Sequence, residues 1–542
     1  MRGGPAARGQ TLISVAGGET IILGPRSLVT SGEGQFAFRG LSGGGYSLSA
    51  TKAGYLPGGF GVVRPGGNPQ SLALAEGERK TDVVVRIFRA ATIAGTVTDD
   101  LGEPLVGARV VASRKMLEGA RAASGIQASA TTDDRGAYRM GGLLPGEYTV
   151  GVTISQTSMP ATGAAGPTTG TFVPGNRRFL LTGGGALAAV QDGTGRLLAY
   201  PSTYYPSART STQSTPVIVR SGDERLGVDI SIPLLPAATV SGRVTSPDGQ
   251  VAGYQLRLTP TDDGGVPVDS AAAFASTDVD GSFTFLGVPA GRYVLQTERV
   301  QPRVAGAPAA SPGQPPPPML FSFMPVSVGD ADVSGLSVIT QPGLTVSGRL
   351  ELEGPAPPPG SRTMVSLTID PLQVANRSTS SINMTGPLVP FSTPAMMPGR
   401  YRAVITAPSG WEVKSAIAGA LDLIDGPFEL VDRDLSNAVI TFTDKPSTIA
   451  GNVRNAGNVD PGAVVLAFPS DPKYWPIAAA VLLRFVSARA TPQGAFGPVS
   501  LRPGDYYVVA IAEELADEWQ DPRRLELLAR HATRVTVGDA QT

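Results

Sequence analysis

Short stretches in which apolar and polar residues alternate recur along the whole chain. Phe36 and Phe38 are separated by one residue, as are Phe283 and Phe285, so each pair lies on one face of a predicted β-strand. Turn-forming sequences such as residues 133–136 precede these stretches. Long windows with the 3.6-residue helical period are rare. The pattern therefore predicts an all-β fold made of antiparallel β-sandwiches.

One segment near the C-terminal end departs from this pattern and predicts a short helix. Asp521 is a good N-cap residue, and Pro522 is favoured at the first helical position. Leu525 and Leu528 follow at helical spacing. His531, the single histidine of the chain, is then a polar residue at the end of the helix rather than a catalytic or metal-binding one.

Two signatures repeat along the chain and mark five units. The first is a glycine that precedes a tyrosine by 12 residues in four copies, with a looser additional copy. The second is a small residue followed by glycine, with valine or leucine two positions later. The repeat tyrosines are Tyr46, Tyr148, Tyr293, Tyr401 and Tyr506, and the opening glycines are Gly95, Gly242, Gly348 and Gly451. Because each recurs at one position per unit, we interpret them as structural framework.

The repeat period is about 105 residues and divides the chain into five predicted β-sandwiches. The predicted units are residues 1–89, 90–236, 237–342, 343–444 and 445–542. The second unit carries an insert near residues 155–216, and the fourth is degenerate. The first unit has no opening signature and the last has no closing strand, so we expect both to be incomplete. The units follow one another without flexible linkers, which predicts a rod of roughly 170 Å.

Composition excludes several classes of protein. The chain of 542 residues has no cysteine, one histidine and a formal net charge of −1. A disulfide scaffold, a thiolate metal site and a zinc site with two imidazoles are therefore excluded. The near-neutral charge predicts no nucleic-acid partner. No apolar window of 18 residues is free of charge, so the chain is not expected to span a membrane.

Four segments of the second unit resemble the carboxypeptidase regulatory-like domain, a transthyretin-like sandwich. They are Ile93–Asp99, Gly102–Val110, Thr132–Tyr138 and Leu144–Val150. The other units match this family in part. The resemblance implies tandem modules of a secreted bacterial protein or of an extension of an outer-membrane receptor, with a fold similar to starch-binding modules. It implies no catalytic residues. We therefore expect an extracytoplasmic protein whose signal peptide was lost with the missing start of the first unit.

Three motifs resemble catalytic or metal-binding sequences, and each has a simpler explanation. Residues 40–44 fit the Gly-x-Ser-x-Gly pattern of serine hydrolases, but they align with the repeat turn and His531 is four units away. Residues 133–136 and 278–281 are rich in aspartate, but they lack the later acidic ligands of a calcium loop. We interpret all three as turns, although calcium binding at the aspartate turns stays open. No catalytic residue, cofactor or metal ligand is predicted.

The candidate ligand-binding residues are Tyr200, Tyr204 and Tyr205, which fall outside the repeat register. They lie between Pro201 and Pro206 in the insert of the second unit. Exposed aromatic rings held by prolines suit stacking on sugar rings or on a peptide. Alternatively, they pack the insert against its own sandwich. The tryptophans outside the repeats are open to the same two interpretations, namely Trp411, Trp475 and Trp519.

The sequence thus predicts a non-enzymatic, extracytoplasmic binding or spacer protein whose preferred ligand class is carbohydrate. An alternative is an accessory arm that binds proteins and is associated with an outer-membrane receptor or a cell-surface assembly. An enzyme is the least favoured class, because the residues that perform acid–base and metal chemistry are scarce.

Overall fold

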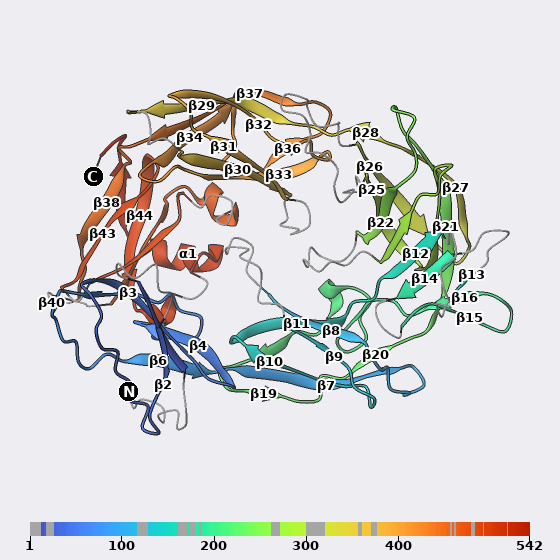
Figure 1. Cartoon of the computed structure of the whole chain (residues 1–542), viewed down its shortest axis with the longest axis horizontal. Helices are drawn as coiled ribbons and strands as arrows, with labels where there is room; N and C mark the ends of the chain where they lie inside the picture. The colour runs from blue at the N-terminus through green and yellow to red at the C-terminus, as the bar shows by residue number, and fades with distance from the viewer. Residues whose placement is uncertain are drawn as a thin grey trace.

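The computed structural model is a closed ring of β-sheet units, which Figure 1 shows in chain order from the N-terminal to the C-terminal unit. Strands make up 55% of it and helices 4%, so the prediction of an all-β fold is confirmed. The structure describes residues 12–17, 26–115, 128–160, 171–172, 179–183, 187–261, 272–299, 320–355, 360–369, 377–455, 458–459, 462–477, 483–491, 493–516 and 519–541. Most of the N-terminal segment 1–19, where a signal peptide would be sought, lies outside these ranges.

The second unit shows the complete repeat as two packed sheets. The strands of the first sheet are β7 (Ala91–Asp99), β10 (Ala137–Leu143), β19 (Glu224–Arg225) and β20 (Ile230–Ile232). Those of the second are β8 (Arg109–Arg114), β9 (Ala128–Thr131), β11 (Gly146–Val152), β17 (Thr203–Tyr204) and β18 (Val217–Val219). A 3₁₀ helix, η2 (Ser211–Gln213), precedes β18. β7 pairs antiparallel with β10 and parallel with β20, the closing strand.

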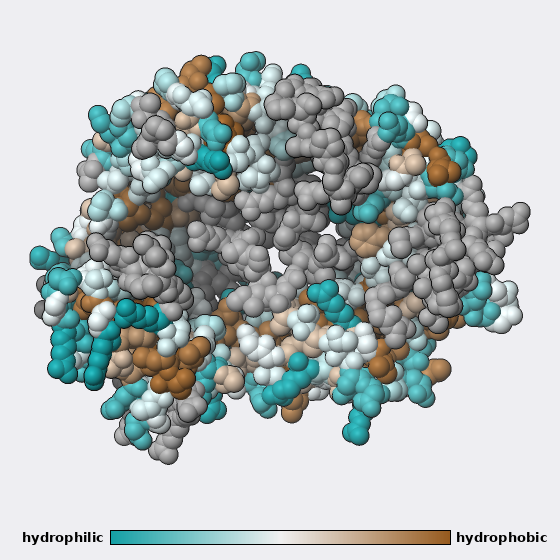
Figure 2. Space-filling view, viewed as in Figure 1, coloured by the Kyte–Doolittle hydropathy of each residue, from teal (hydrophilic) through white to brown (hydrophobic). Residues whose placement is uncertain are grey.

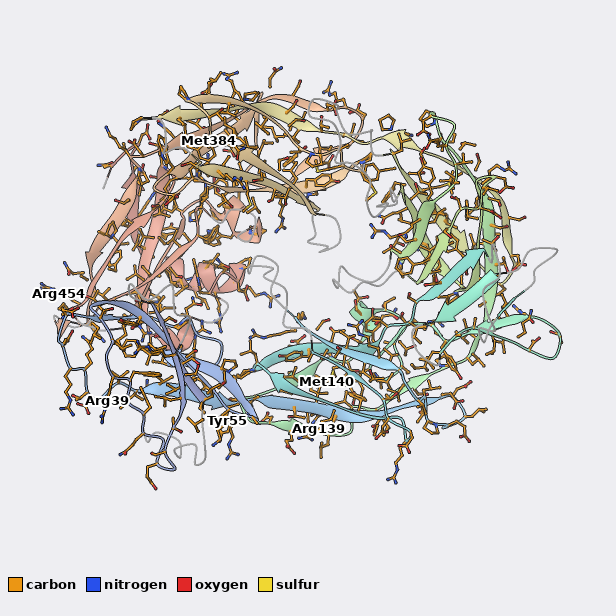
Figure 3. All side chains as sticks on the ribbon, viewed as in Figure 1. Arg39, Tyr55, Arg139, Met140, Met384 and Arg454 are labelled. Atoms are coloured by element: carbon orange, nitrogen blue, oxygen red, sulfur yellow. The ribbon has the colours of Figure 1, made fainter. Side chains whose placement is uncertain are left out.

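Successive side chains on each strand point to opposite faces of the sheet, and those on the inner faces form the core between the two sheets. Arg139 and Met140 are neighbours on β10, and Figure 3 shows both. Met140 is buried in the core with Ile93 and Val150, whereas Arg139 is exposed and pairs with Glu224 on the outer face. The two faces of the strand therefore differ as the period-2 pattern predicts.

The third unit repeats this plan and also takes up strands from the insert of the second unit. Its own strands are β21 (Leu235–Thr245), β22 (Tyr254–Pro260), β23 (Ala273–Ser276), β24 (Ser282–Pro289), β25 (Gly291–Arg299), β26 (Leu320–Val328), β27 (Val333–Ile339) and β28 (Gln341–Pro342). The insert adds β12 (Gln156–Pro160), β13 (Thr171–Phe172), β14 (Phe179–Gly183), β15 (Val190–Gln191) and β16 (Leu197–Ala199). β12 pairs with β23, and β16 pairs with β21, so the insert extends both sheets of the third unit.

The fourth unit is degenerate in sequence but complete in structure. One sheet contains β29 (Val346–Glu353), β32 (Leu388–Ser392), β34 (Glu412–Ala418), β35 (Leu421–Asp422) and β37 (Leu435–Thr443). The other contains β30 (Arg362–Ile369), β31 (Arg377–Asn383), β33 (Gly399–Thr406) and β36 (Phe428–Leu430). Its core includes Trp411, Phe428 and Phe442 from both sheets. Apolar residues at the right positions therefore suffice where the repeat signature has decayed.

The fifth unit has an opening strand that pairs on one side, within the described residues. Its strands are β38 (Thr448–Asn452), β39 (Arg454–Asn455), β40 (Asn458–Val459), β41 (Val464–Pro469), β42 (Val486–Arg489), β43 (Ala495–Ser500), β44 (Gly504–Ile511) and β45 (Thr533–Val537). Its helices are η3 (Pro472–Ile477), η4 (Glu513–Leu515) and α1 (Pro522–Ala529). The Asp521 side chain accepts from Arg523 N at the start of α1, which confirms the predicted helix, and His531 is exposed beyond its end.

The first unit is a single sheet in the described residues. It contains β1 (Leu12–Gly17), β2 (Arg26–Val29), β3 (Gly44–Thr51), β4 (Tyr55–Phe60), β5 (Ser71–Leu74) and β6 (Val85–Arg89). The prediction that Phe36 and Phe38 lie on a β-strand is wrong, because this segment forms no strand and both rings are half-buried. In the third unit the matching Phe283 and Phe285 are buried on a strand that pairs with the opening strand β21. The described part of the first unit therefore has a closing strand but no opening strand.

The predicted rod is wrong, because the first and fifth units lie side by side (Figure 1). Arg489 at the end of β42 donates a hydrogen bond to the carbonyl oxygen of Gly61, which follows β4. These residues are 428 positions apart in the sequence. Four short joints connect the five units along the chain, and their angles bring the first and fifth units together in a ring rather than extending a line.

The visible face of the ring mixes hydrophilic and hydrophobic residues, with hydrophobic residues in small, separate patches (Figure 2). No helix in the described part of the chain is long and apolar enough to cross a membrane.

Candidate ligand-binding cleft between the second and third units

The repeat tyrosines occupy one buried position in all five units. Their exposed fractions are 5% or less, and each hydroxyl donates a hydrogen bond to the backbone carbonyl four residues earlier in the chain. The acceptors are Ser42, Leu144, Pro289, Met397 and Arg502, at distances of 2.6 to 2.8 Å. Burial raises the pKa of Tyr293 and of Tyr401 to about 12. These rings brace a turn, and their burial points to a structural rather than a ligand-binding role.

The opening glycines lie where two backbones approach closely. A Cβ at Gly95 would lie 2.1 Å from Val228 O on the segment before β20, and one at Gly348 would lie 1.8 Å from Ala438 O on β37. The same holds for Gly242 and Leu336 O, at 2.2 Å. A side chain at these positions would push the closing strand away, so glycine is required there.

The three candidate tyrosines have different surroundings, and Tyr204 is not exposed. Tyr204 is 2% exposed and lies on β17 over Gly151, where a Cβ would be 2.4 Å from its ring. Tyr205 is half-buried against the core of the second unit, and its N–H donates to Val150 O. Tyr200 is half-buried and borders a cleft. The expectation that the Tyr204 ring is exposed for stacking is therefore wrong. The ring instead packs the insert against the second unit's own sandwich.

The tryptophans are buried rather than displayed. Trp411, Trp475 and Trp519 are 8%, 8% and 9% exposed. Trp475 Nε1 donates to Pro469 O at 2.9 Å, and its ring meets Phe468 edge-on. Their apolar rings fill the cores of the fourth and fifth units, where large aromatic side chains contribute most to stability.

A cleft of about 210 Å³ lies at the joint between the second and third units. Its second-unit side includes Tyr200, Ser202 and Arg209, and its third-unit side includes Arg292 and Tyr293. The walls are held in place by backbone pairing across the joint, because the insert is part of the third unit's sheets. Gln156 N donates to Ala272 O at 3.0 Å at the base of this joint.

The lining of the cleft combines an aromatic ring with two guanidinium groups. Tyr200 offers part of an aromatic face, and burial together with the charges of Asp99 and Asp100 raises its pKa. Arg209 and Arg292 are exposed cations at the rim. Among the described lining residues, Tyr200 can offer a stacking surface, and Arg209 and Arg292 can contact anions. An aromatic face beside two guanidinium groups suits a ring-shaped ligand with an acidic group.

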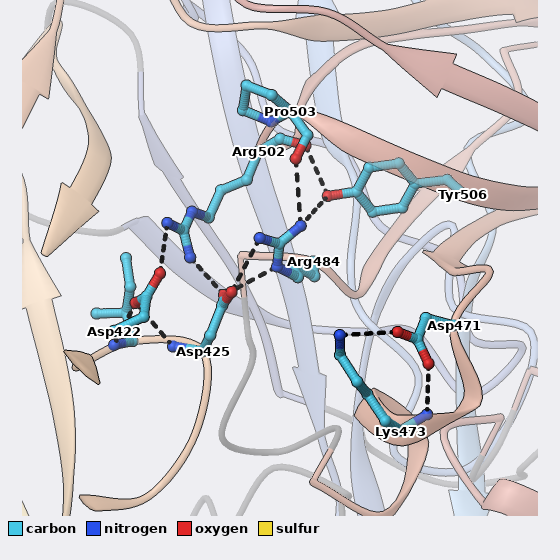
Figure 4. A network of polar contacts seen from close by, with 9 residues as sticks. Asp422, Asp425, Asp471, Lys473, Arg484, Arg502, Pro503 and Tyr506 are labelled. Atoms are coloured by element: carbon cyan, nitrogen blue, oxygen red, sulfur yellow. Dashed lines mark hydrogen bonds and ion pairs between the residues drawn. The ribbon is translucent and has the colours of Figure 1, made fainter. Parts of the chain in front are cut away.

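A larger cleft of about 400 Å³ lies between the fourth and fifth units, and its lining residues Lys414 and Arg502 form ion pairs. Arg484 donates two hydrogen bonds to Asp425, at 2.8 and 2.9 Å, and Figure 4 shows Arg502 bridging Asp425 and Asp422. Burial lowers the pKa of Arg484, but hydrogen bonds from its guanidinium to Asp425 and that charge raise it more. This network stiffens the joint between the fourth and fifth units, and its guanidinium and carboxylate groups bind one another.

The catalytic and calcium-like motifs form turns, as expected. Ser42 O accepts from the Tyr46 hydroxyl in the repeat turn. The Asp133 carboxylate accepts from the backbone N–H groups of Arg135 and Ala137, and the Asp280 carboxylate accepts from Ser282. Such bonds are typical of aspartate-stabilised turns. No cluster of metal-binding side chains is found among the described residues.

Residues 92–168 match the family model of the carboxypeptidase regulatory-like domain. This match confirms the resemblance for the second unit. No curated protein matches the chain.

Among solved structures, the chain is similar to the TIE protein of Bacillus anthracis, at 9% identity over 81% of this chain and 69% of that one, with a TM-score of 0.14. A streptococcal ancillary pilin shares 10% identity over 66% of this chain and 99% of its own, with a TM-score of 0.19. The RrgB pilus protein of Streptococcus pneumoniae shares 10% over 78% and 90%, with a TM-score of 0.15. At these scores, the likenesses carry no information on the arrangement of the units or on function.

Proposed function

We propose that the protein is a non-catalytic binding protein of the extracytoplasmic space, and that the cleft between the second and third units binds a carbohydrate with an acidic group. The observation that carries the proposal is that Tyr200, Arg209 and Arg292 line the same cleft. Sugar rings stack on aromatic faces, and guanidinium groups bind carboxylate or sulfate groups with paired hydrogen bonds. The family match in the second unit supports a regulatory or binding module rather than an enzyme.

The ring shape changes the expected role from spacer to binding platform. A spacer holds its two ends apart, whereas here the first and fifth units are in contact. The insert fixes the second and third units to each other through two sheets. A cleft at such a joint is formed before the ligand arrives, which lowers the entropic cost of binding.

Binding to an array of neutral and acidic glycans tests the proposal. We expect acidic glycans to bind, and Tyr200→Ala and Arg292→Ala each to weaken binding about tenfold, which is about 1.4 kcal/mol. Tyr55→Ala on β4 and Arg139→Ala on β10 are matched controls outside the cleft and should bind like the unmodified protein. Tyr204→Ala does not test the site, because this ring is buried.

Two results would contradict the proposal. One is the absence of binding to every acidic glycan on the array. The other is binding that Tyr200→Ala and Arg292→Ala leave unchanged, which would place the ligand elsewhere on the ring.

A further inference from the structure

The cleft between the fourth and fifth units has the size and position of a small-molecule site. Its volume is about 400 Å³, and such sites usually measure about 300–1,000 Å³ and often lie between domains. The fourth unit contributes part of β34 and the end of β37. The fifth unit contributes the joint from Lys445 to Ser447, residues of β42 and β43, the turn before β44, and Asp539.

Ion pairs across the joint fix the two walls of the cleft relative to each other. Lys414 on β34 donates hydrogen bonds to Asp539 of the fifth unit and to Glu353, both at 2.8 Å. Arg502 of the fifth unit donates to Asp422 of the fourth at 3.0 Å (Figure 4). Because these contacts connect the two units, the cleft is formed before a ligand arrives, which lowers the entropic cost of binding.

Apolar side chains line the cleft, and several of them are partly open to solvent. Leu483, Val486 and Val499 are half-buried, whereas Val413 and Leu501 are 6% and 4% exposed. Apolar surface that a ligand removes from water contributes favourably to binding, above all in a concave site. The lining therefore suits a ligand with an apolar body.

Two charged groups of opposite sign also line the cleft, and neither has an ion-pair partner in the described part of the chain. Lys445 is exposed. Glu412 is half-buried, and its carboxylate accepts a hydrogen bond from the Ser500 hydroxyl at 3.4 Å, which is long for such a bond. The other charged groups of the lining belong to the ion pairs across the joint. One cation and one carboxylate are thus left for a ligand.

Ser447 adds a polar group to the lining close to Lys445 in the chain. It is 5% exposed, and its carbonyl oxygen accepts from Leu501 N at 3.0 Å, which fixes its backbone. Within the described residues, its hydroxyl forms no hydrogen bond. Since a buried hydroxyl group normally has a partner, a polar group of a ligand fits beside it.

We propose that this cleft binds a small zwitterion with an apolar body, of the class of apolar amino acids and dipeptides. The ligand's carboxylate pairs with Lys445 and accepts from Ser447, and its ammonium group pairs with Glu412. An apolar anion would leave Glu412 beside a like charge, and an apolar cation would do the same for Lys445. The site is separate from the cleft between the second and third units.

Isothermal titration calorimetry of the whole chain with leucyl-leucine tests the proposal. We expect saturable binding at one site. Lys445→Gln and Glu412→Gln should each weaken it at least about tenfold, because each removes one charge that pairs with the ligand. Lys473→Gln and Glu429→Gln are matched controls, since both residues are exposed and neither lines the cleft.

Blocked dipeptides test the two charges on the unmodified protein, so the test stays valid if a variant melts at a lower temperature. N-acetyl-leucyl-leucine lacks the ammonium group and leucyl-leucinamide lacks the carboxylate, and each should bind about tenfold more weakly than leucyl-leucine. Glu412→Gln should not weaken the acetylated dipeptide further, and Lys445→Gln should not weaken the amide further.

Free leucine distinguishes the two sources of such a zwitterion. Leucine that binds as tightly as the dipeptide identifies a free amino acid as the ligand, and tighter binding of the dipeptide identifies a peptide. The proposal fails if neither compound binds saturably, if the blocked dipeptides bind as well as leucyl-leucine, or if Lys445→Gln and Glu412→Gln leave binding unchanged.

Discussion

The repeat tyrosine plays the same structural role in all five units. Its ring fills the core of the unit, and its hydroxyl holds the carbonyl group of the preceding turn. A phenolate at this position would be unfavourable for two reasons: its charge would be buried away from water, and it could no longer donate a hydrogen bond to the carbonyl oxygen beside it. Burial accordingly raises the pKa of Tyr148 and Tyr506 as well as those of Tyr293 and Tyr401.

These tyrosines predict a loss of stability at alkaline pH. The folded state favours the neutral phenol, so the contribution of each ring is fully present below pH 10 and is lost as the pH rises towards 12. For Tyr293 and Tyr401 the rise in pKa to about 12 corresponds to roughly 2–3 kcal/mol each. Urea unfolding between pH 9 and pH 12 measures the loss, and Tyr401→Phe should reduce it in the fourth unit. Ultraviolet titration of all tyrosines near pH 10 in the folded protein would argue against this prediction.

Among the elements, the strands of the second unit's insert form part of the neighbouring third unit. Ser158 on β12 is fully buried, and its hydroxyl accepts a hydrogen bond from Leu286 N on β24, at 2.9 Å. Gln156 donates to Leu187 O within the insert, at 3.0 Å. The insert thus completes the hydrogen bonding of a unit to which it does not belong in sequence.

Ser158→Val should therefore destabilise the third unit rather than the second. It removes the acceptor of Leu286 N, and a buried N–H without a partner costs about 1–3 kcal/mol. Hydrogen exchange should become faster in β24 and stay unchanged in β10. Thr157→Val, at the half-buried neighbouring position, is the control. Faster exchange in β10 but not in β24 would show that the insert supports its own unit instead.

For the whole molecule, closure of the ring depends on polar contacts at its joints. The fourth and fifth units are joined by Asp425 with Arg484 and Arg502, which are largely buried and form a connected network (Figure 4). The first and fifth units are joined through Arg489, which also pairs with Glu513. Ion pairs that share partners and exclude water hold a geometry better than isolated surface pairs do.

Small-angle scattering distinguishes the ring from the rod. Five units of about 100 residues in a ring have a radius of gyration of about 30 Å, whereas a rod of the same units has about 50 Å. Arg489→Ala removes the contact with Gly61 and should increase the measured radius, while Arg139→Ala on the outer face of β10 should not. A value near 50 Å for the unmodified chain would mean that the ring is open in solution.

The sequence by itself determined the repeat, the strand faces and the framework residues, because these depend on local patterns. The spacing of Phe283 and Phe285 predicts their strand face correctly, whereas Phe36 and Phe38 have the same spacing but form no strand in the first unit. Tyr148 recurs in register because each unit needs the same turn, and Gly95 because the opening strand approaches another backbone closely in the second, third and fourth units. Asp521 and Pro522 likewise mark the start of α1 through local hydrogen bonding.

Tertiary structure alone decided the burial of Tyr204, the destination of the insert and the shape of the molecule. Nothing in the sequence near Tyr204 shows that Gly151, on another strand, leaves room for its ring. The pairing of β12 with β23 depends on which sheet edge is open next to the insert. The ring depends on joint angles and on a contact between Gly61 and Arg489, which lie at opposite ends of the chain. Local patterns specify which residues face a core, but long-range geometry decides which cores and edges meet.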